Sequence, residues 1–175
     1  MHMFGDLHQP LHVSGGYRGG NGISVCFGTH CGNNTRNNLH TVWDTYVPHT
    51  MRGLGHYDTR NKDRKSAKAW ADELFEEQKA EGVDVAGECS DITDKDGTCQ
   101  LVWARESNRR NCDYVLKGGV EWVKRTDLSK GYYEGAVPVV KAAVSNAGFR
   151  LAWWLETMVV KARADADMRD NGFEL

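Results

Sequence analysis

Residues 2–12, His-Met-Phe-Gly-Asp-Leu-His-Gln-Pro-Leu-His, place three histidines and an aspartate at the start of a chain of 175 residues. This stretch predicts a helix over residues 2–8, which Pro10 interrupts because proline lacks the backbone donor that a helix needs. His2 and Asp6 are four residues apart in this helix and therefore lie on one face. An imidazole and a carboxylate held in this way can bind one metal ion.

The same spacing recurs in residues 38–45, Asn-Leu-His-Thr-Val-Trp-Asp-Thr, where His40 and Asp44 are also four residues apart. Asn38 is expected to cap the helix that carries this second pair. His12 adds a third imidazole soon after the first pair. Mixed ligation by His and Asp suits Zn²⁺, and several such groups in a short segment suit a site with more than one ion. These residues therefore predict a zinc site.

Histidine is not spread evenly along the chain. All seven histidines lie within the first 56 residues, which also hold ten of the 19 glycines but only five of the 46 Lys, Arg, Asp and Glu residues. This asymmetry predicts a metal site in residues 1–56 and a helical scaffold in residues 57–164. Pro10 disturbs the geometry that His8 would need as a ligand. His30, His49 and His56 are expected in loops, without a metal role.

Apolar spacing predicts an all-α protein with one small β-hairpin. Helical periodicity covers residues 62–81, 99–125 and 132–164, with an irregularity at Gly118-Gly119. The hairpin would join residues 23–27 to a return arm before Asn38. Residues 1–164 would form one domain, followed by a polar tail at 165–175 that frays. The last helix should turn an apolar stripe to the core: Val140, Val144, Ala147, Leu151, Trp154 and Leu155.

Composition excludes two classes of function. A net charge of −2 provides no basic surface that could hold nucleic acid by charge alone. No stretch approaches the roughly 18 uninterrupted apolar residues that a membrane span requires, so no membrane partner is expected.

The five cysteines allow two local disulfides. Cys26 and Cys31 flank a short loop, and Cys89 and Cys99 bracket a polar loop, so each pair is a candidate bridge. Cys112 is left over, which indicates a free thiol, an intermolecular bond or a missing partner. The alternative is five reduced thiols in a cytosolic protein.

Several motifs follow one another from residue 2 to about residue 160: HMFGDLHQPLH (2–12), GGN (19–21), NLHTVWDT (38–45), WARES with a later cysteine (103–112), and GYYEGAVPVVKAA followed by AGFRLAWWL (131–155). In this order they closely resemble the zinc-dependent single-strand nuclease and 3′-nucleotidase family of the S-one/P-one type. That family is similar in fold to bacterial zinc-dependent phospholipase C.

The resemblance implies a helical domain with a trinuclear zinc centre. His12, His40 and Asp44 match the protein ligands of one zinc ion, and His2 matches a ligand of a second. Asp6 matches the catalytic carboxylate that bridges the second and third ions, the pair that activates the attacking water.

The resemblance also implies a substrate and a location. Gly19 and Asn21 match the rim that receives a nucleobase. The expected activity is hydrolysis of single-stranded DNA, RNA and 3′-nucleotides, with 5′-phosphorylated products, by a monomeric secreted enzyme. A glycosylation acceptor at Asn33, in Asn33-Asn34-Thr35, agrees with secretion.

The sequence departs from the family pattern ahead of the first motif. Family members take further zinc ligands from that region, including an N-terminal tryptophan, together with a cysteine that would pair with Cys112. We therefore expect an N-terminally truncated chain, preceded by a signal peptide, that retains one zinc ion of three and has impaired activity. The alternatives are a phospholipase C-like phosphodiesterase and a non-catalytic zinc-binding remnant.

Overall fold

The computed structural model describes residues 2–32, 37–55, 60–81, 89, 91–93 and 97–170. The fold is all-α, as the apolar periodicity predicts. Its elements are α1 (His2–His8), α2 (Leu39–Thr41), the π-helical turn η1 (Val42–Tyr46), α3 (Val47–Met51), α4 (Arg60–Glu81), α5 (Thr98–Arg110), the π-helical turn η2 (Asn111–Val115), α6 (Val120–Arg125) and α7 (Gly131–Asp170).

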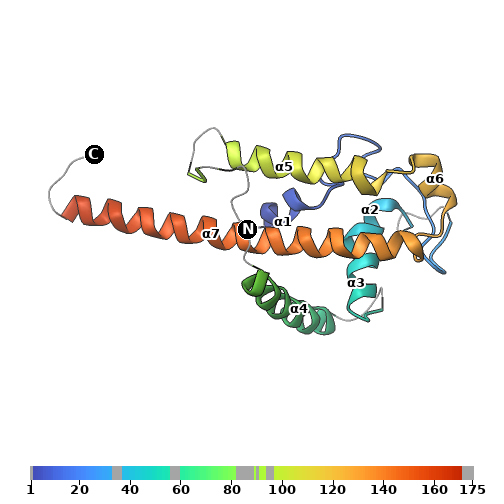
Figure 1. Ribbon diagram of the computed structural model, residues 1–175, viewed down its shortest axis with the longest axis horizontal. Helices are drawn as coiled ribbons and strands as arrows, with labels where there is room; N and C mark the ends of the chain where they lie inside the picture. The colour runs from blue at the N-terminus through green and yellow to red at the C-terminus, as the bar shows by residue number, and fades with distance from the viewer. Residues whose placement is uncertain are drawn as a thin grey trace.

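Helix α7 is the long central helix against which α1, α3 and α4 pack (Figure 1). Helix α1 contacts both α5 and α7, while α3 and α4 contact α7. Helix α4 lies on the side of α7 opposite α5, and the last turns of α7 extend beyond both (Figure 1). Of the segments that carry the two His-Asp pairs, α1 therefore packs on α7 directly, and α2–η1 is connected to it through α3.

The buried side chains form two clusters. The larger one joins the loop after α1 to α2, η1 and the first half of α7, through residues such as Leu11, Leu39, Val42, Ala136 and Val140. The smaller one contains Cys89, Ile92, Cys99 and Trp103, with Phe4 of α1 and Trp153 and Trp154 of α7 packed against it. The segment that carries His2, Asp6 and His12 thus contributes to both clusters, through Phe4 and Leu11.

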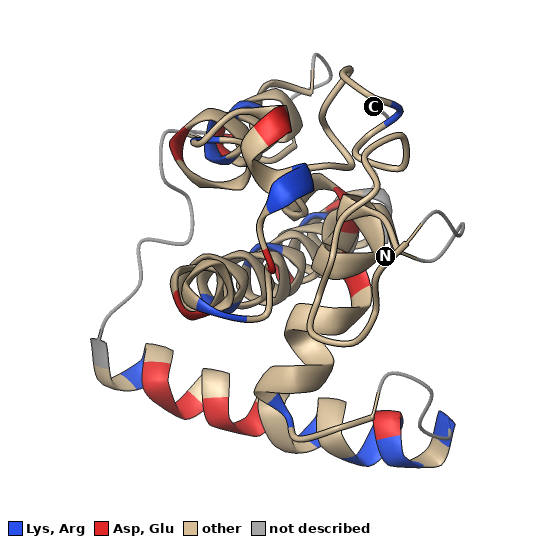
Figure 2. Ribbon diagram, turned by 90° about the vertical axis from the view of Figure 1, so that its right-hand side faces the viewer, with Lys and Arg blue, Asp and Glu red and all other residues tan. Residues whose placement is uncertain are grey.

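Helix α4 depends on its neighbours more than on its own sequence. Five of its six Lys and Arg residues lie in the first half and five of its six acidic residues in the second, Lys79 and Asp63 being the exceptions (Figure 2). This order opposes the helix dipole, which favours acidic residues near the start and basic residues near the end. Arg52 after α3 pairs with Glu73, and Lys141 of α7 pairs with Glu77 at 2.9 Å. These contacts attach the acidic half of α4 to the rest of the molecule.

Among the described residues, the predicted pairing of residues 23–27 with a return arm before Asn38 consists of isolated bridges. Ser24 and Asn38 form an isolated antiparallel bridge, as do Phe27 and His30. The disulfide between Cys26 and Cys31 closes the loop around the second bridge, and the Val25 backbone N–H donates to the Asn37 carbonyl at 3.1 Å. The segment nevertheless buries Ile23, Val25 and Phe27 in the larger core.

Helix α7 differs from its predicted form at its end and along its apolar stripe. It continues to Asp170 instead of ending at residue 164, and residues 165–170 contain neither Pro nor Gly, the residues that most disfavour a helix. Of the six stripe residues only Val140 is buried; Val144 and Leu155 are 41% and 40% exposed. The neighbouring elements therefore cover only part of the apolar stripe.

Within the described part of the chain, no helix combines the length and the apolar character that crossing a membrane would require.

Candidate metal centre

The five predicted ligands form one continuous row in which imidazole and carboxylate groups alternate. His2 Nε2 lies 3.5 Å from Asp6 Oδ1, which in turn lies 3.2 Å from His12 Nδ1. His12 Nε2 lies 3.3 Å from Asp44 Oδ1, and Asp44 Oδ2 lies 3.0 Å from His40 Nε2. The two His-Asp pairs, 38 positions apart in the sequence, thus meet at His12.

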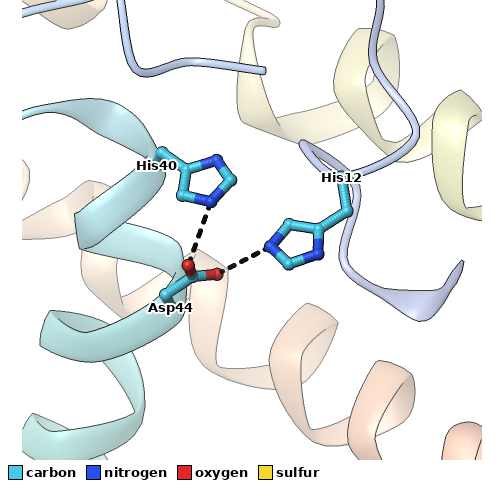
Figure 3. Close-up of side chains that lie close together, drawn as sticks. All are labelled: His12, His40 and Asp44. Carbon is cyan, nitrogen blue, oxygen red and sulfur yellow. Dashed lines mark ion pairs between the residues drawn. The ribbon is translucent and has the colours of Figure 1, made fainter. Parts of the chain in front are cut away.

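Three of these side chains converge closely enough to share one ion. Ligand atoms of His12, His40 and Asp44 all lie within 4.8 Å of one another, the one such group of three among the described residues. Figure 3 shows both imidazoles directed at the carboxylate of Asp44. The two rings stack at a centroid distance of 4.8 Å with an interplanar angle of 5°.

The local structure around His40 and Asp44 follows from their sequence. The Asn38 side chain accepts a hydrogen bond from the Thr41 backbone N–H at 2.8 Å, so the predicted N-cap is present. Asp44 itself lies in the π-helical turn η1. Such turns are rare and are frequently found at functional sites. His40 and Asp44 therefore face each other across the junction of an α-helical and a π-helical turn.

The glycine-rich loop supports His40 from behind. His40 Nδ1 donates a hydrogen bond to the carbonyl oxygen of Gly19 at 2.7 Å, so Nε2, 3.0 Å from Asp44 Oδ2, is the ring nitrogen on the side of the other candidate ligands. Gly19 has φ +62°, and a Cβ built there would lie 2.7 Å from the Leu11 carbonyl oxygen. Glycine is thus required at this position for both conformation and space.

The residues on either side of this glycine share its conformation. Tyr17, Arg18, Gly19 and Gly20 have φ of 50°, 56°, 62° and 84°, a left-handed run of four residues. For the two residues with a Cβ this conformation costs about 1–2 kcal/mol each. Backbone strain of this kind concentrates at functional sites.

The predicted base-binding residues lie on the exposed side of the same loop. Asn21 is exposed, and its side-chain amide donates to the Arg18 carbonyl at 3.1 Å. The Gly19 carbonyl accepts a hydrogen bond from His40, so Gly19 directly contacts one of the candidate ligands. The rim residues and the ligands are therefore adjacent.

A buried ionic network below α1 was not foreseen from the sequence. His8 is 1% exposed, and its Nδ1 lies 2.6 Å from the Phe4 carbonyl. Arg150 of α7 donates to His8 Nε2 at 2.9 Å and to Glu106 of α5 at 2.6 Å. The one signal in the sequence is a single arginine in the apolar stretch 147–155.

The electrostatics of this network follow from burial and from charge. Burial and the nearby Arg150 lower the pKa of His8, although the Phe4 carbonyl opposes this, so the imidazole is held neutral. Burial opposes ionisation of Glu106, but the hydrogen bond and charge of Arg150, with Arg110, lower its pKa below the ordinary value. Glu106 is therefore the ionised partner of two arginines.

A cavity of about 290 Å³ opens beside the ligands. Asp6, His12 and Asp44 line one part of it, and Val140 and Val144 of α7 line another. Gln9 also lines it and donates to Asp44 Oδ1 at 2.8 Å. The candidate ligands thus adjoin a partly apolar recess.

The cysteine predictions are confirmed. Cys26 is bonded to Cys31 and Cys89 to Cys99, whereas Cys112 is free and exposed.

The remaining sequence predictions differ in outcome. His49 contacts the Gly55 carbonyl, and His30 packs beside the Tyr46 ring, so neither joins the ligand row. Asn33 and His56 lie outside the described residues.

Comparison with known proteins gives one consistent result. The family model described as S1/P1 Nuclease matches residues 1–160. The chain is 37% identical over 160 residues to Nuclease S1 of Aspergillus oryzae, covering 89% of this chain and 51% of that protein. It is 30% identical over 161 residues to Nuclease P1 of Penicillium citrinum, covering 89% and 54%.

A plant relative gives a similar match. Endonuclease 2 of Arabidopsis thaliana is 30% identical over 152 residues, covering 86% of this chain and 47% of that protein. The chain therefore spans about half the length of the curated relatives that it matches.

Proposed function

This chain belongs to the S1/P1 nuclease family, and from that premise we propose that it acts as a zinc-dependent endonuclease and 3′-nucleotidase. Its substrates would be single-stranded DNA and RNA and 3′-nucleotides, and hydrolysis of the nucleic acids would leave 5′-phosphorylated products. The observation that carries the proposal is the convergence of His12, His40 and Asp44.

The donor set fits zinc. Two imidazole nitrogens and one carboxylate are ligands that zinc prefers, and three protein ligands leave a fourth position open for water or substrate. His40 also has the outer hydrogen bond to a backbone carbonyl that metal-binding histidines usually have. A zinc ion bound there would stabilise negative charge on a phosphate and lower the pKa of water. We assign one zinc ion per chain to these three residues.

Asp6 and His2 extend the site. Asp6 contacts both His2 and His12, so it lies where a carboxylate could serve a second ion together with His2. We assign to Asp6 the catalytic bridging role that the family resemblance implies.

Substrate selection is assigned to the loop that supports His40. A base placed against Gly19 and Asn21 lies next to the ligands, and a duplex cannot present such a base without unstacking it. Binding by a metal and a base contact needs no basic surface, which is consistent with a net charge of −2. Single-stranded substrates are therefore preferred in this proposal.

The two disulfides support an extracellular location, because disulfides persist in oxidising compartments. The acceptor sequence at Asn33 agrees with this. We propose a secreted monomer.

The test combines metal content with cleavage. Elemental analysis should find about one zinc ion per chain, and none in His40→Ala. Cleavage of single-stranded DNA should fall in His40→Ala and stay unchanged in His49→Ala, the matched control, since His49 contacts Gly55 and not the ligands. Equal zinc content in both variants would contradict the proposal. Hydrolysis of lecithin but not of 3′-AMP would favour a phospholipase instead.

A further inference from the structure

A second cavity is lined by residues of α6 and of the start of α7, two elements that lie together at one end of the molecule (Figure 1). Its volume is about 780 Å³, and it shares no lining residue with the cavity beside the metal ligands. The two are separated by Trp43 and Tyr132, whose side chains are joined by a 2.8 Å hydrogen bond from Trp43 Nε1. Trp43 lines the first cavity and Tyr132 the second.

Trp122 provides an exposed aromatic surface in this second cavity. Its side chain is 46% exposed although it is a large apolar group. The indole lies directly on Gly118, where a Cβ would come within 2.6–2.8 Å of three of its ring atoms. Tyr132 supports the ring from α7 at a centroid distance of 6.2 Å. The indole is thus held in place by its neighbours while remaining open to solvent.

Two lysines flank this surface. Lys117 and Lys130 both line the cavity and are exposed. Asp127 is the one carboxylate in the lining, and its Oδ1 already has three hydrogen-bond donors. These are the Gly28 and Ser129 backbone N–H groups and the Ser129 hydroxyl. Lys130 lies 3.7 Å from Asp127 Oδ2, whereas no ion pair joins Lys117 to a carboxylate of the described residues. The cavity therefore combines an aromatic ring with positive charge.

We propose that this cavity is an accessory subsite for single-stranded nucleic acid, in which a base stacks on Trp122 and the adjoining phosphates lie at Lys117 and Lys130. Aromatic side chains beside cationic ones bind single strands in this way, because every base has a stacking face and every nucleotide a phosphate. The subsite extends the proposed nuclease function and rests on it: a strand cleaved at the metal ligands would be held at a second point, so longer substrates would bind more tightly.

Binding is best measured without catalysis. The probe is a fluorescein-labelled oligothymidylate of about 12 nucleotides, titrated with the full chain in EDTA and followed by anisotropy. Trp122→Ala should weaken binding about tenfold, which is a typical effect of losing one stacked base, while Trp122→Phe should retain most of the affinity. An abasic strand of equal length should bind the unaltered chain as weakly as the oligothymidylate binds Trp122→Ala.

Charge is tested separately from stacking. Lys117→Gln with Lys130→Gln should lower the slope of log Kd against log salt by about 1.4, since each phosphate contact to a single strand contributes about 0.7. Lys124→Gln is the matched control, because Lys124 lies on α6 but lines a different cavity. Gly118→Ala should displace the indole and weaken binding as Trp122→Ala does.

Specific results would overturn the subsite. One is that Trp122→Ala binds the oligothymidylate as tightly as the unaltered chain does. Another is that the unaltered chain binds the abasic strand as tightly as the oligothymidylate. The third is that Lys124→Gln lowers the salt slope as much as the change of Lys117 and Lys130 does. Trp122→Ala is not informative if circular dichroism shows that it has lost helicity. The proposal is then tested by Trp122→Phe, the lysine variants and the abasic strand. Failure of the proposed nuclease function is a separate result, seen as no cleavage when zinc is supplied.

Discussion

Arg150 donates a hydrogen bond to Nε2 of His8 across a separation of 142 residues, at 2.9 Å. His8 lies between Asp6 and His12 in sequence, so the contact fixes the segment that carries these two candidate ligands to α7. Arg150 also binds Glu106 and lies over the Trp103 ring, 5.2 Å from its centroid. One side chain of α7 thus forms hydrogen bonds with both α1 and α5 and fixes their positions relative to α7.

Replacing this arginine should be costly. Arg150→Met leaves Glu106 and His8 without their buried partner, and we expect a loss of about 2–4 kcal/mol in the free energy of unfolding. Arg150→Met combined with Glu106→Gln should cost less than the sum of the two single changes, because the contact between Arg150 and Glu106 is then lost only once. Urea unfolding followed by circular dichroism measures both. Arg109→Met, on the exposed face of α5, is the control and should stay within about 0.5 kcal/mol. A similar cost for Arg109→Met would show that the effect is not specific to the network.

Gly19→Ala should weaken zinc binding without removing a ligand. The added Cβ meets the Leu11 carbonyl at 2.7 Å, so the loop must shift and the Gly19 carbonyl must leave His40. Loss of such an outer hydrogen bond typically lowers metal affinity about 10- to 100-fold. Competition with a zinc-sensitive dye measures the change. Gly15→Ala, where the Cβ meets nothing within 4 Å, should bind zinc normally. Unchanged zinc affinity in Gly19→Ala would show that this loop does not support the zinc ligand His40.

Asp127 should contribute stability that acid removes. Hydrogen bonds from the Gly28 backbone N–H and from Ser129 lower the pKa of Asp127 to about 2, from 3.8. The folded state favours the ionised form, so its contribution is complete above pH 3.8 and is lost as pH falls towards 2. Asp127→Asn should therefore be less stable than the unaltered chain at pH 7, and the difference should shrink between about pH 4 and pH 2. Urea midpoints across this range measure it. A difference independent of pH would show that the carboxylate charge is not the cause.

Cys112 should be the one thiol that reacts without reduction. It is exposed, while the other four cysteines form two disulfides. Ellman's reagent should detect about one thiol per folded chain and none in Cys112→Ser. Detection of three or more thiols in the unreduced chain would place the cysteines in the reduced state that the sequence left open.

Periodicity and spacing predicted much of this structure. The i,i+4 pairs, the Asn38 cap and the long helices depend on residues close together in sequence, whose effects are local. The meeting of His12 with Asp44 was expected from the family resemblance more than from spacing, because the two residues are 32 positions apart and come from different elements. The left-handed run at Tyr17–Gly20 had only its glycines as a signal.

What the sequence did not predict depends on contacts between distant segments. The bond between His8 and Arg150 joins two helices that periodicity treats separately. The apolar stripe of α7 was assigned wholly to the core, but burial depends on which elements lie alongside, and Val144 and Leu155 have too little cover. The recess behind Trp122 likewise requires α6 and α7 to be placed relative to each other.

Both hydrophobic cores contain side chains of one continuous helix, α7. Tyr132, Ala136 and Val140 belong to the larger core and Trp153 and Trp154 to the smaller, all on one helix of 40 residues. A shift in register by one residue would turn this helix by roughly 100° and displace both sets of side chains together. A displacement of α7 along its axis would therefore act on both cores at once.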